Sequence, residues 1–262
     1  MSTPRTSRFR AALARPGGPA LGTWVKLPVM ESVELLALAG FDFVVIDLEH
    51  SAMNLETTYR LIGTANHLGM APIVRIPALD GGIAPRVLDA GAEGIMLPHV
   101  DTVGQAEAAV RAVRFPPRGG RGVGATSRAG AWGALDRAEY LRFGQEEVVL
   151  IAQIESAQAA RSAGAIAAVA GVDALLVGAA DLSTSEAAAE DDPRVVELIT
   201  TAIKACTAAG KPIGNAGAAT RRSAQAAVEA GYAFTMLGND AGLLGSAAAA
   251  AVREGRAAGG DR

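Results

Sequence analysis

Two acidic residues, each following a short apolar run, have types and spacing that point to a shared metal ion. Glu155 follows the run 148–154 and Asp181 follows the run 174–177. A carboxylate at the end of an apolar strand is costly to bury without a partner. Each could instead cap a helix, where carboxylates are favoured in the first turn. Together, with Gly178 allowing close backbone approach, they favour an oxygen-rich site for Mg2+, Mn2+ or Co2+.

Two more side chains at strand ends could act on a bound substrate. His50 follows the run 41–47 and is the best candidate base, because the ordinary pKa of histidine is near ~6.5. Arg75 ends the next run, and its planar guanidinium suits a carboxylate or a developing enolate, with a structural ion pair as the alternative. His99, after the fourth run, is a weaker second candidate. Each of these residues also has an ordinary structural interpretation.

The neighbours of these residues could support the chemistry. Asp47 and Glu49 could orient the His50 ring or hold a metal-bound water. Trp24 is expected either to pack or to form a wall of the substrate pocket. Lys26 leaves a Schiff-base mechanism formally open. A metal ion is nevertheless the better candidate for the electron sink, because the chain offers carboxylates that could hold it.

The elements that must position these residues alternate regularly along the chain. Eight apolar runs are each followed by a helical stretch, which indicates a parallel sheet buried on both faces. This count predicts a (β/α)8 TIM barrel, with a doubly wound open sheet as the alternative. The expected strands are 21–27, 41–47, 71–75, 94–97, 148–154, 174–177, 212–215 and 234–237. The expected helices are 29–39, 55–68, 83–89, 103–113, 157–169, 193–209, 220–229 and 241–253.

Composition limits the classes of partner. The chain has 262 residues, 50% of them hydrophobic, and a formal net charge of −3, which argues against nucleic acid or an anionic membrane as the main partner. Its single cysteine, Cys206, fits a reducing cytoplasm. We expect a flexible N-terminal segment (1–19), a single barrel domain (20–255) and a flexible C-terminal tail (256–262). The glycine-rich segment 114–132 is either a flexible excursion or a loop that covers the site or meets a neighbouring subunit, with Arg118 or Arg121 facing an anion.

The motifs together resemble the HpcH/HpaI family of class II aldolases, which are metal-dependent enzymes that make or cleave a bond to the methyl carbon of pyruvate. The resemblance extends from Leu21 to about Gly245, in the order and spacing of the family. The most informative matches are Leu-Gly-Thr-Trp (21–24), Asp-Leu-Glu-His (47–50), Gln-Ile-Glu (153–155), Gly-Ala-Ala-Asp-Leu-Ser (178–183) and Leu-Gly-Asn-Asp (237–240).

The resemblance implies a role for each matching residue. It implies that Glu155 and Asp181 bind the metal, that His50 is the acid/base, and that Arg75 polarises the oxo group. It also implies that Asp47 supports metal-bound waters and that Asp89 pairs with the histidine of a neighbouring subunit. Substrate-binding positions implied by the resemblance are Trp24, Arg75, Gln153, Gly178, Ala180, Asp181 and Leu182. The implied assembly is a homo-oligomer, a trimer of dimers (a hexamer), with the last helix exchanged between subunits.

The implied reaction joins pyruvate or a related 2-oxo acid to an aldehyde, or cleaves a 4-hydroxy-2-oxo acid, through a metal-stabilised enolate. Alternatives are oxaloacetate decarboxylation, a specialised biosynthetic use of the same enolate, an acyl-CoA (malyl or citryl) lyase, and a catalytically silent barrel. The chain departs from the family pattern at Ala179, where proline is usual, and in the short segment 184–192. This segment follows a metal ligand, so it bears on substrate range and activity.

Overall fold

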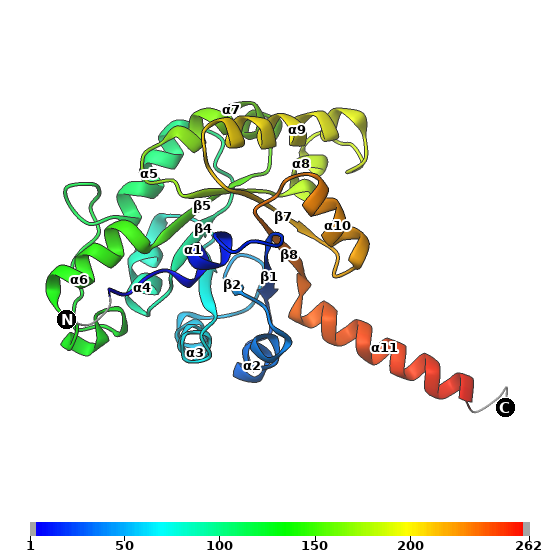
Figure 1. Ribbon diagram of the computed structural model, residues 1–262, viewed down its shortest axis with the longest axis horizontal. Helices are drawn as coiled ribbons and strands as arrows, with labels where there is room; N and C mark the ends of the chain where they lie inside the picture. Colours follow the sequence, from blue (N-terminus) through cyan, green and yellow to red (C-terminus); the bar gives the residue numbers. More distant parts are fainter. Residues whose placement is uncertain (1–3, 259–262) are drawn as a thin grey trace.

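The protein folds as a closed barrel of eight parallel strands. The computed structural model describes residues 4–258, in which neighbouring strands pair in chain order and β8 pairs back onto β1. The helices lie outside the strands, which confirms the predicted (β/α)8 class (Figure 1). The strands are β1 (Ala20–Val25), β2 (Phe43–Asp47), β3 (Ala71–Arg75), β4 (Gly94–Leu97), β5 (Val149–Ile154), β6 (Ala174–Val177), β7 (Ile213–Gly217) and β8 (Phe234–Asn239).

Every predicted helix has a counterpart, and three short helices are additional. The predicted ones correspond to α2 (Met30–Ala39), α3 (Leu55–His67), α4 (Ile83–Asp89), α5 (Val103–Val113), α7 (Ala157–Ala168), α9 (Pro193–Ala208), α10 (Arg221–Glu229) and α11 (Asp240–Ala258). The additional ones are α1 (Arg8–Leu13), α6 (Arg137–Arg142) and α8 (Ala179–Ser185). Single 3-10 or π turns occur at Asp80–Gly82, Arg128–Gly133 and Phe143–Glu147.

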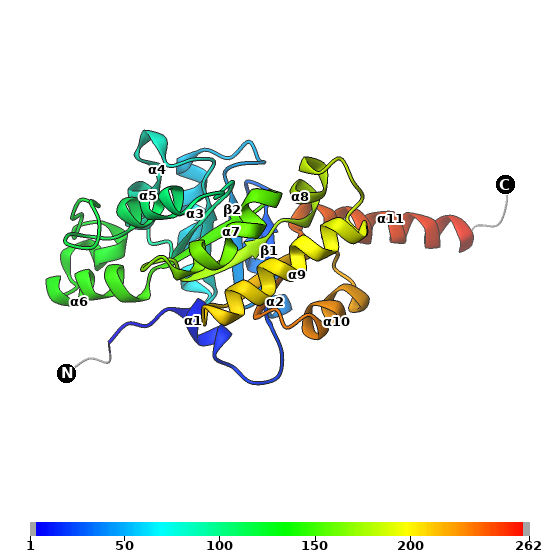
Figure 2. The same cartoon turned by 90° about the horizontal axis from the view of Figure 1, so that it is seen from above.

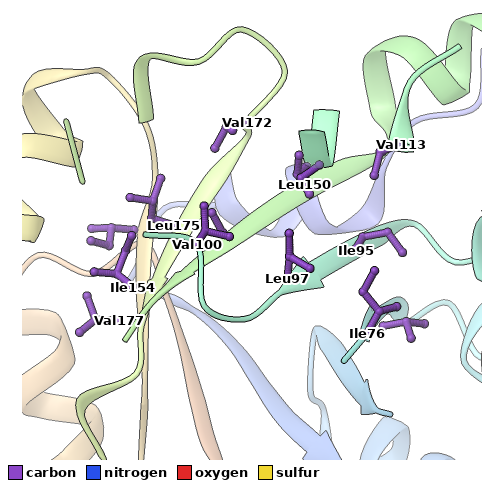
Figure 3. Packing of buried hydrophobic residues seen from close by; sticks show 14 of the residues in the cluster. Ile76, Ile95, Leu97, Val100, Val113, Leu150, Ile154, Val172, Leu175 and Val177 are labelled. Atoms are coloured by element: carbon purple, nitrogen blue, oxygen red, sulfur yellow. The ribbon is translucent and has the colours of Figure 1, made fainter. Parts of the chain in front are cut away.

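The strands bury two separate sets of side chains because successive residues point to opposite faces. On β2, Phe43 and Val45 belong to the cluster inside the barrel, whereas Val44 and Ile46 belong to the larger cluster between strands and helices. Figure 3 shows part of that outer cluster, with side chains of β4, β5 and β6 meeting residues such as Val113 of α5. Burial on both faces explains why the strands read as continuous apolar runs.

The N-terminal segment predicted to be flexible contains an ordered helix, so that prediction is wrong for α1. Phe9 of α1 is fully buried inside the lower end of the barrel, where its ring centroid lies 4.9 Å from that of Phe43 and 5.4 Å from that of Phe234. The three rings meet edge to face, a favourable arrangement for aromatic quadrupoles. A single aromatic residue in a polar segment anchors α1, which the local composition does not reveal.

The C-terminal helix stands away from the barrel. Helix α11 runs outward from the end of β8 in both views (Figures 1 and 2), and residues 256–258, predicted as part of a flexible tail, belong to it. The rest of that predicted tail, 259–262, lies outside the described residues, as do residues 1–3 of the N-terminal segment. The side chains of Leu244 and Val252 are 63% and 51% exposed. Helix α11 therefore presents apolar surface that this chain does not cover.

The glycine-rich segment 114–132 packs against the side of the barrel and does not line its central cavity. Arg121 donates to the Asp89 carboxylate at 2.7 Å and stacks on Phe115, while Arg118 donates to the carbonyl of Gln145. Both arginines thus have partners within the chain. Contact of the segment with a neighbouring subunit stays a prediction.

None of the helices described between residues 4 and 258 combines the length and apolar character needed to span a bilayer. The cytoplasmic location expected from the sequence stays a prediction. The division into one barrel domain with a flexible segment at each end likewise stays an expectation. Two details differ: residues 8–13 form α1, and residues 256–258 belong to α11.

Candidate active site

A cavity of about 560 Å³ opens at the carboxyl ends of the strands. Parallel barrels collect functional side chains at this end because all eight βα connections converge there. Residues at the ends of seven strands line the cavity, among them Trp24, Lys26, His50, Arg75, Gln153, Glu155, Asp181 and Asn239. The structure therefore brings together most of the site residues named from the sequence.

Glu155 is a buried carboxylate at the floor of this cavity. Its side chain follows β5, and the residue is only 4% exposed. One carboxylate oxygen accepts a hydrogen bond from the Gln153 amide at 2.7 Å, and the other accepts one from the backbone N–H of His99 at 2.9 Å. Burial raises the pKa of Glu155 above its ordinary range, and the negative charges of Asp181 and Glu49 act in the same direction. A cation bound beside Glu155 would favour its ionised form and so offset the cost of burying that charge.

Asp181 stands in the first turn of α8, beside Glu155. It is exposed to the cavity, and its charge is among those that raise the pKa of Glu155. Gly178 separates the two: a Cβ added there would lie 2.8 Å from Cγ of Glu155. Glycine is therefore required for the end of β6 to pass this close to the Glu155 side chain.

The donor set fits a divalent cation that keeps several water or substrate ligands. Glu155 and Asp181 supply carboxylate oxygens, and the buried Oε1 of Gln153 has no hydrogen-bond partner within the described chain. No group of three or more His, Cys, Asp or Glu residues suited to a metal occurs between residues 4 and 258. Two protein carboxylates with additional oxygen ligands are typical of Mg2+ rather than of a closed zinc site.

Arg75 is held rigidly at the end of β3, on the wall of the cavity. Its Nε and Nη2 donate to the two oxygens of Asp47 at 2.9 and 2.6 Å, and Nη1 lies 3.1 Å from Oε2 of Glu49. The guanidinium also stacks on the Trp24 ring, 4.1 Å from its centroid. The structural ion pair that the sequence left open as an alternative role for Arg75 is therefore present. Arg75 nevertheless lines the cavity, so the pair orients it without removing it from the site.

Asp47 holds Arg75 in place by accepting hydrogen bonds from its guanidinium group. Burial disfavours the charged form of Asp47, but hydrogen bonds from Arg75 and from the backbone N–H groups of His50 and Glu49 outweigh it, so its pKa lies below the ordinary range. Both oxygens are engaged by protein groups. Support of metal-bound waters by Asp47 stays a prediction.

Two histidines lie near Glu49 at the rim. Nε2 of His50 is 3.8 Å from Glu49 Oε2, and Nε2 of His99 is 3.5 Å from Glu49 Oε1. Strand β2 ends at Asp47, and Glu49 reaches the site from the turn that follows the strand. Nδ1 of His99 lies 3.2 Å from Oε2 of Glu155, which places this weaker candidate closer to the Glu155 carboxylate than its sequence context suggested.

Two residues named from the resemblance lie apart from the cavity within this chain. Leu182 is fully buried in the outer apolar cluster, and Asp89 pairs with Arg121 on the barrel's flank. Conversely, the cavity is lined by Glu190 and Asn239, which sequence reasoning did not select. Asn239 ends the last strand, a signal that could have identified it. Glu190 lies in an irregular segment, whose path no periodicity reveals.

Comparisons with known proteins agree with this geometry. The family described as HpcH/HpaI aldolase/citrate lyase matches residues 20–247. The chain is 39% identical to a hydroxypyruvate/pyruvate aldolase of Chromohalobacter salexigens over 95% of this chain and 96% of that protein. It is 37% identical to a 2-dehydro-3,6-dideoxy-6-sulfogluconate aldolase of Pseudomonas putida, covering 90% and 92%. A crystal structure of an HpcH/HpaI aldolase/citrate lyase family protein from Burkholderia cenocepacia superposes with a TM-score of 0.88 at 34% identity, covering 96% and 100%.

Proposed function

Because the chain belongs to the HpcH/HpaI aldolase/citrate lyase family and is an aldolase, we propose that Glu155 and Asp181 hold the divalent cation with which it acts on pyruvate or a related 2-oxo acid. The observation that carries this proposal is the meeting of these two carboxylates with His50 and Arg75 around one cavity. When bound, Mg2+, Mn2+ or Co2+ would supply positive charge that stabilises the enolate of the 2-oxo acid.

Arg75 is the group that steadies the oxo oxygen of the substrate. Its hydrogen bonds to Asp47 use two of the five N–H groups of a guanidinium, so others can donate toward the cavity. The stacked Trp24 ring and the buried Asp47 carboxylate fix its orientation before substrate arrives. Such preorganised donors are effective because they need no reorganisation during the reaction.

His50 is the proton carrier. In the cleavage direction it takes the proton of the 4-hydroxyl group as the bond between C3 and C4 breaks, which leaves an aldehyde and places the electron pair on the 2-oxo acid fragment. Return of a proton to C3 then gives pyruvate. The His50 side chain is 56% exposed, and Glu49 lies 3.8 Å from Nε2, where its charge can stabilise the imidazolium.

A homo-oligomer is the second part of the proposal. It is supported by the exposed apolar side chains of α11 and by those of Leu35 and Leu38 on α2, which are 66% and 83% exposed. A trimer of dimers with exchanged C-terminal helices would cover α11 and bring Asp89 toward the histidine of a neighbouring subunit. Asp89 is on the flank of the barrel, where such a neighbour could reach it.

Metal removal and substitution test the proposal. Retro-aldol activity should disappear on chelation, return with Mg2+, Mn2+ or Co2+, and be lost with metal binding in Glu155→Gln. The exposed Glu107→Gln on α5 is the matched control and should behave as wild type. His50→Asn should lose aldol activity while still binding metal. Activity that survives complete chelation would exclude the metal mechanism, and loss of metal binding in the His50 variant would reassign that residue.

A further inference from the structure

The charged side chains that line the cavity come from different parts of its rim. The acidic residues Glu155, Asp181 and Glu190 follow β5 and β6. The basic residues are Lys26, which follows β1, and Arg75, which ends β3. In a closed barrel of eight strands in chain order, β1 and β5 lie opposite one another. Lys26 therefore faces Glu155 across the cavity, with the carboxylate of Asp47 beside it.

The two basic groups are not equally available. Arg75 is bonded to Asp47 through two nitrogens and is also paired with Glu49. The Lys26 ammonium lies 3.6 Å from Asp47 Oδ2, beyond hydrogen-bond distance, and makes no hydrogen bond to any residue from 4 to 258. Its side chain is 32% exposed and lines the cavity. Lys26 is thus ion-paired with Asp47, but its three N–H donors make no hydrogen bond within the described chain and can donate to a ligand.

The backbone that carries Lys26 is fixed from the other end of the chain. The buried carboxylate of Asp240, the first residue of α11, accepts hydrogen bonds from the backbone N–H groups of Lys26 and Leu27 at 2.9 and 3.0 Å. It also accepts one from the Ser32 hydroxyl at 2.7 Å. The backbone of Lys26 is therefore anchored at the cavity wall. Its ammonium group makes no hydrogen bond within the described chain and can reach a ligand.

We propose that Lys26 is a specificity-determining residue whose ammonium group binds a negatively charged group on the aldehyde substrate. The inference rests on the proposed function, which places the 2-oxo acid against Glu155 and Asp181 on the far side. A cavity of about 560 Å³ lies in the size range of pockets for ligands much larger than a three-carbon acid. The space between Lys26 and the two carboxylates can thus hold the aldehyde with its anionic end toward Lys26.

Two aldehydes of the same carbon count separate charge from size. Glyoxylate carries a carboxylate at neutral pH, whereas glycolaldehyde carries a hydroxyl group. With pyruvate as donor, kcat/KM is measured for each aldehyde in the metal-loaded wild type, Lys26→Met and Lys26→Arg. Lys204→Met, at an exposed position on α9, is the matched control. A longer carboxylate (succinic semialdehyde) and a phosphate (glyceraldehyde 3-phosphate) then distinguish which anion fits best.

We expect the ratio of kcat/KM for glyoxylate over glycolaldehyde to fall at least about tenfold in Lys26→Met, the scale of one lost hydrogen bond to a charged group. The loss should lie mainly in KM for glyoxylate. Lys26→Arg should keep the preference, and Lys204→Met should match wild type. In the wild type itself, added salt should lower kcat/KM for glyoxylate more than for glycolaldehyde, a measurement that does not depend on any variant folding.

The outcomes separate this inference from the function on which it rests. If both aldehydes lose the same factor in Lys26→Met, or salt affects them equally, Lys26 does not read charge and the inference is overturned while aldolase activity stands. A wild type that prefers glycolaldehyde also overturns it. If neither aldehyde reacts with pyruvate in the metal-loaded wild type, the choice of pyruvate as donor fails first.

Discussion

Replacing Gly178 with alanine should weaken metal binding without touching a metal ligand. The added Cβ would lie 2.8 Å from Cγ and 3.0 Å from Oε1 of Glu155, closer than unbonded atoms tolerate. The backbone at Gly178 has φ −93° and ψ 84°, outside the left-handed region, so the new methyl group adds little backbone strain of its own. The cost therefore falls on the Glu155 side chain, which must move or compress its neighbours.

The size of the effect follows from the two ways in which Glu155 can respond: its side chain compresses its neighbours, or it moves. Overpacking in a rigid interior costs about 1–3 kcal/mol. Disturbing a group that supports a metal ligand lowers affinity by about 10–100-fold, equivalent to about 1.4–2.7 kcal/mol. Because Glu155 is hydrogen-bonded on both oxygens, moving it also breaks its contact with Gln153 or His99. We therefore expect Mn2+ affinity to fall at least about tenfold. The unfolding temperature should fall by about 2–4 °C for each kcal/mol of overpacking.

The assay is titration of purified protein with Mn2+, followed by electron paramagnetic resonance of the free ion, with thermal unfolding measured in parallel. Gly104→Ala is the control, because a Cβ at Gly104 meets no atom within 4 Å. Wild-type Mn2+ affinity in a folded Gly178→Ala protein would refute the reasoning, since Glu155 would then not be a ligand or would have room to adjust.

Three further predictions use other parts of the structure. Asp47→Asn removes the carboxylate that accepts two hydrogen bonds from the buried Arg75 and leaves Glu49 as the remaining acidic partner, so it should lower the free energy of unfolding by up to about 3–5 kcal/mol at neutral pH. Because the folded-state pKa of Asp47 is depressed, this difference should shrink as pH falls below about 4, measured by urea unfolding across pH. Phe9→Ala should cost about 3–5 kcal/mol in the same experiment, and a smaller loss would mean that α1 does not close the barrel. Leu244→Glu should reduce the oligomer mass in light scattering, whereas the similarly exposed Val228→Glu on α10 should not.

Much of the fold was predictable because its signals are local. The apolar runs and intervening helical patterns predict the strands and one helix after each of them, since burial on both faces leaves no polar alternation. The short helices α1, α6 and α8 were missed because six or seven residues are too few to show a helical period. In α1, only Phe9 and Ala12 are buried.

The candidate site divides in the same way. The sequence by itself determined that acids, a histidine and an arginine follow successive strands, and the closed parallel barrel then makes their meeting at one rim a geometric necessity. Which of these side chains pair was decided only by the tertiary structure. Asp47 accepts hydrogen bonds from Arg75 but forms only a longer ion pair with Lys26, and Asp240 holds the Lys26 backbone across more than two hundred residues. Such pairings depend on distances of a few tenths of an ångström between elements remote in sequence, and no local pattern encodes them.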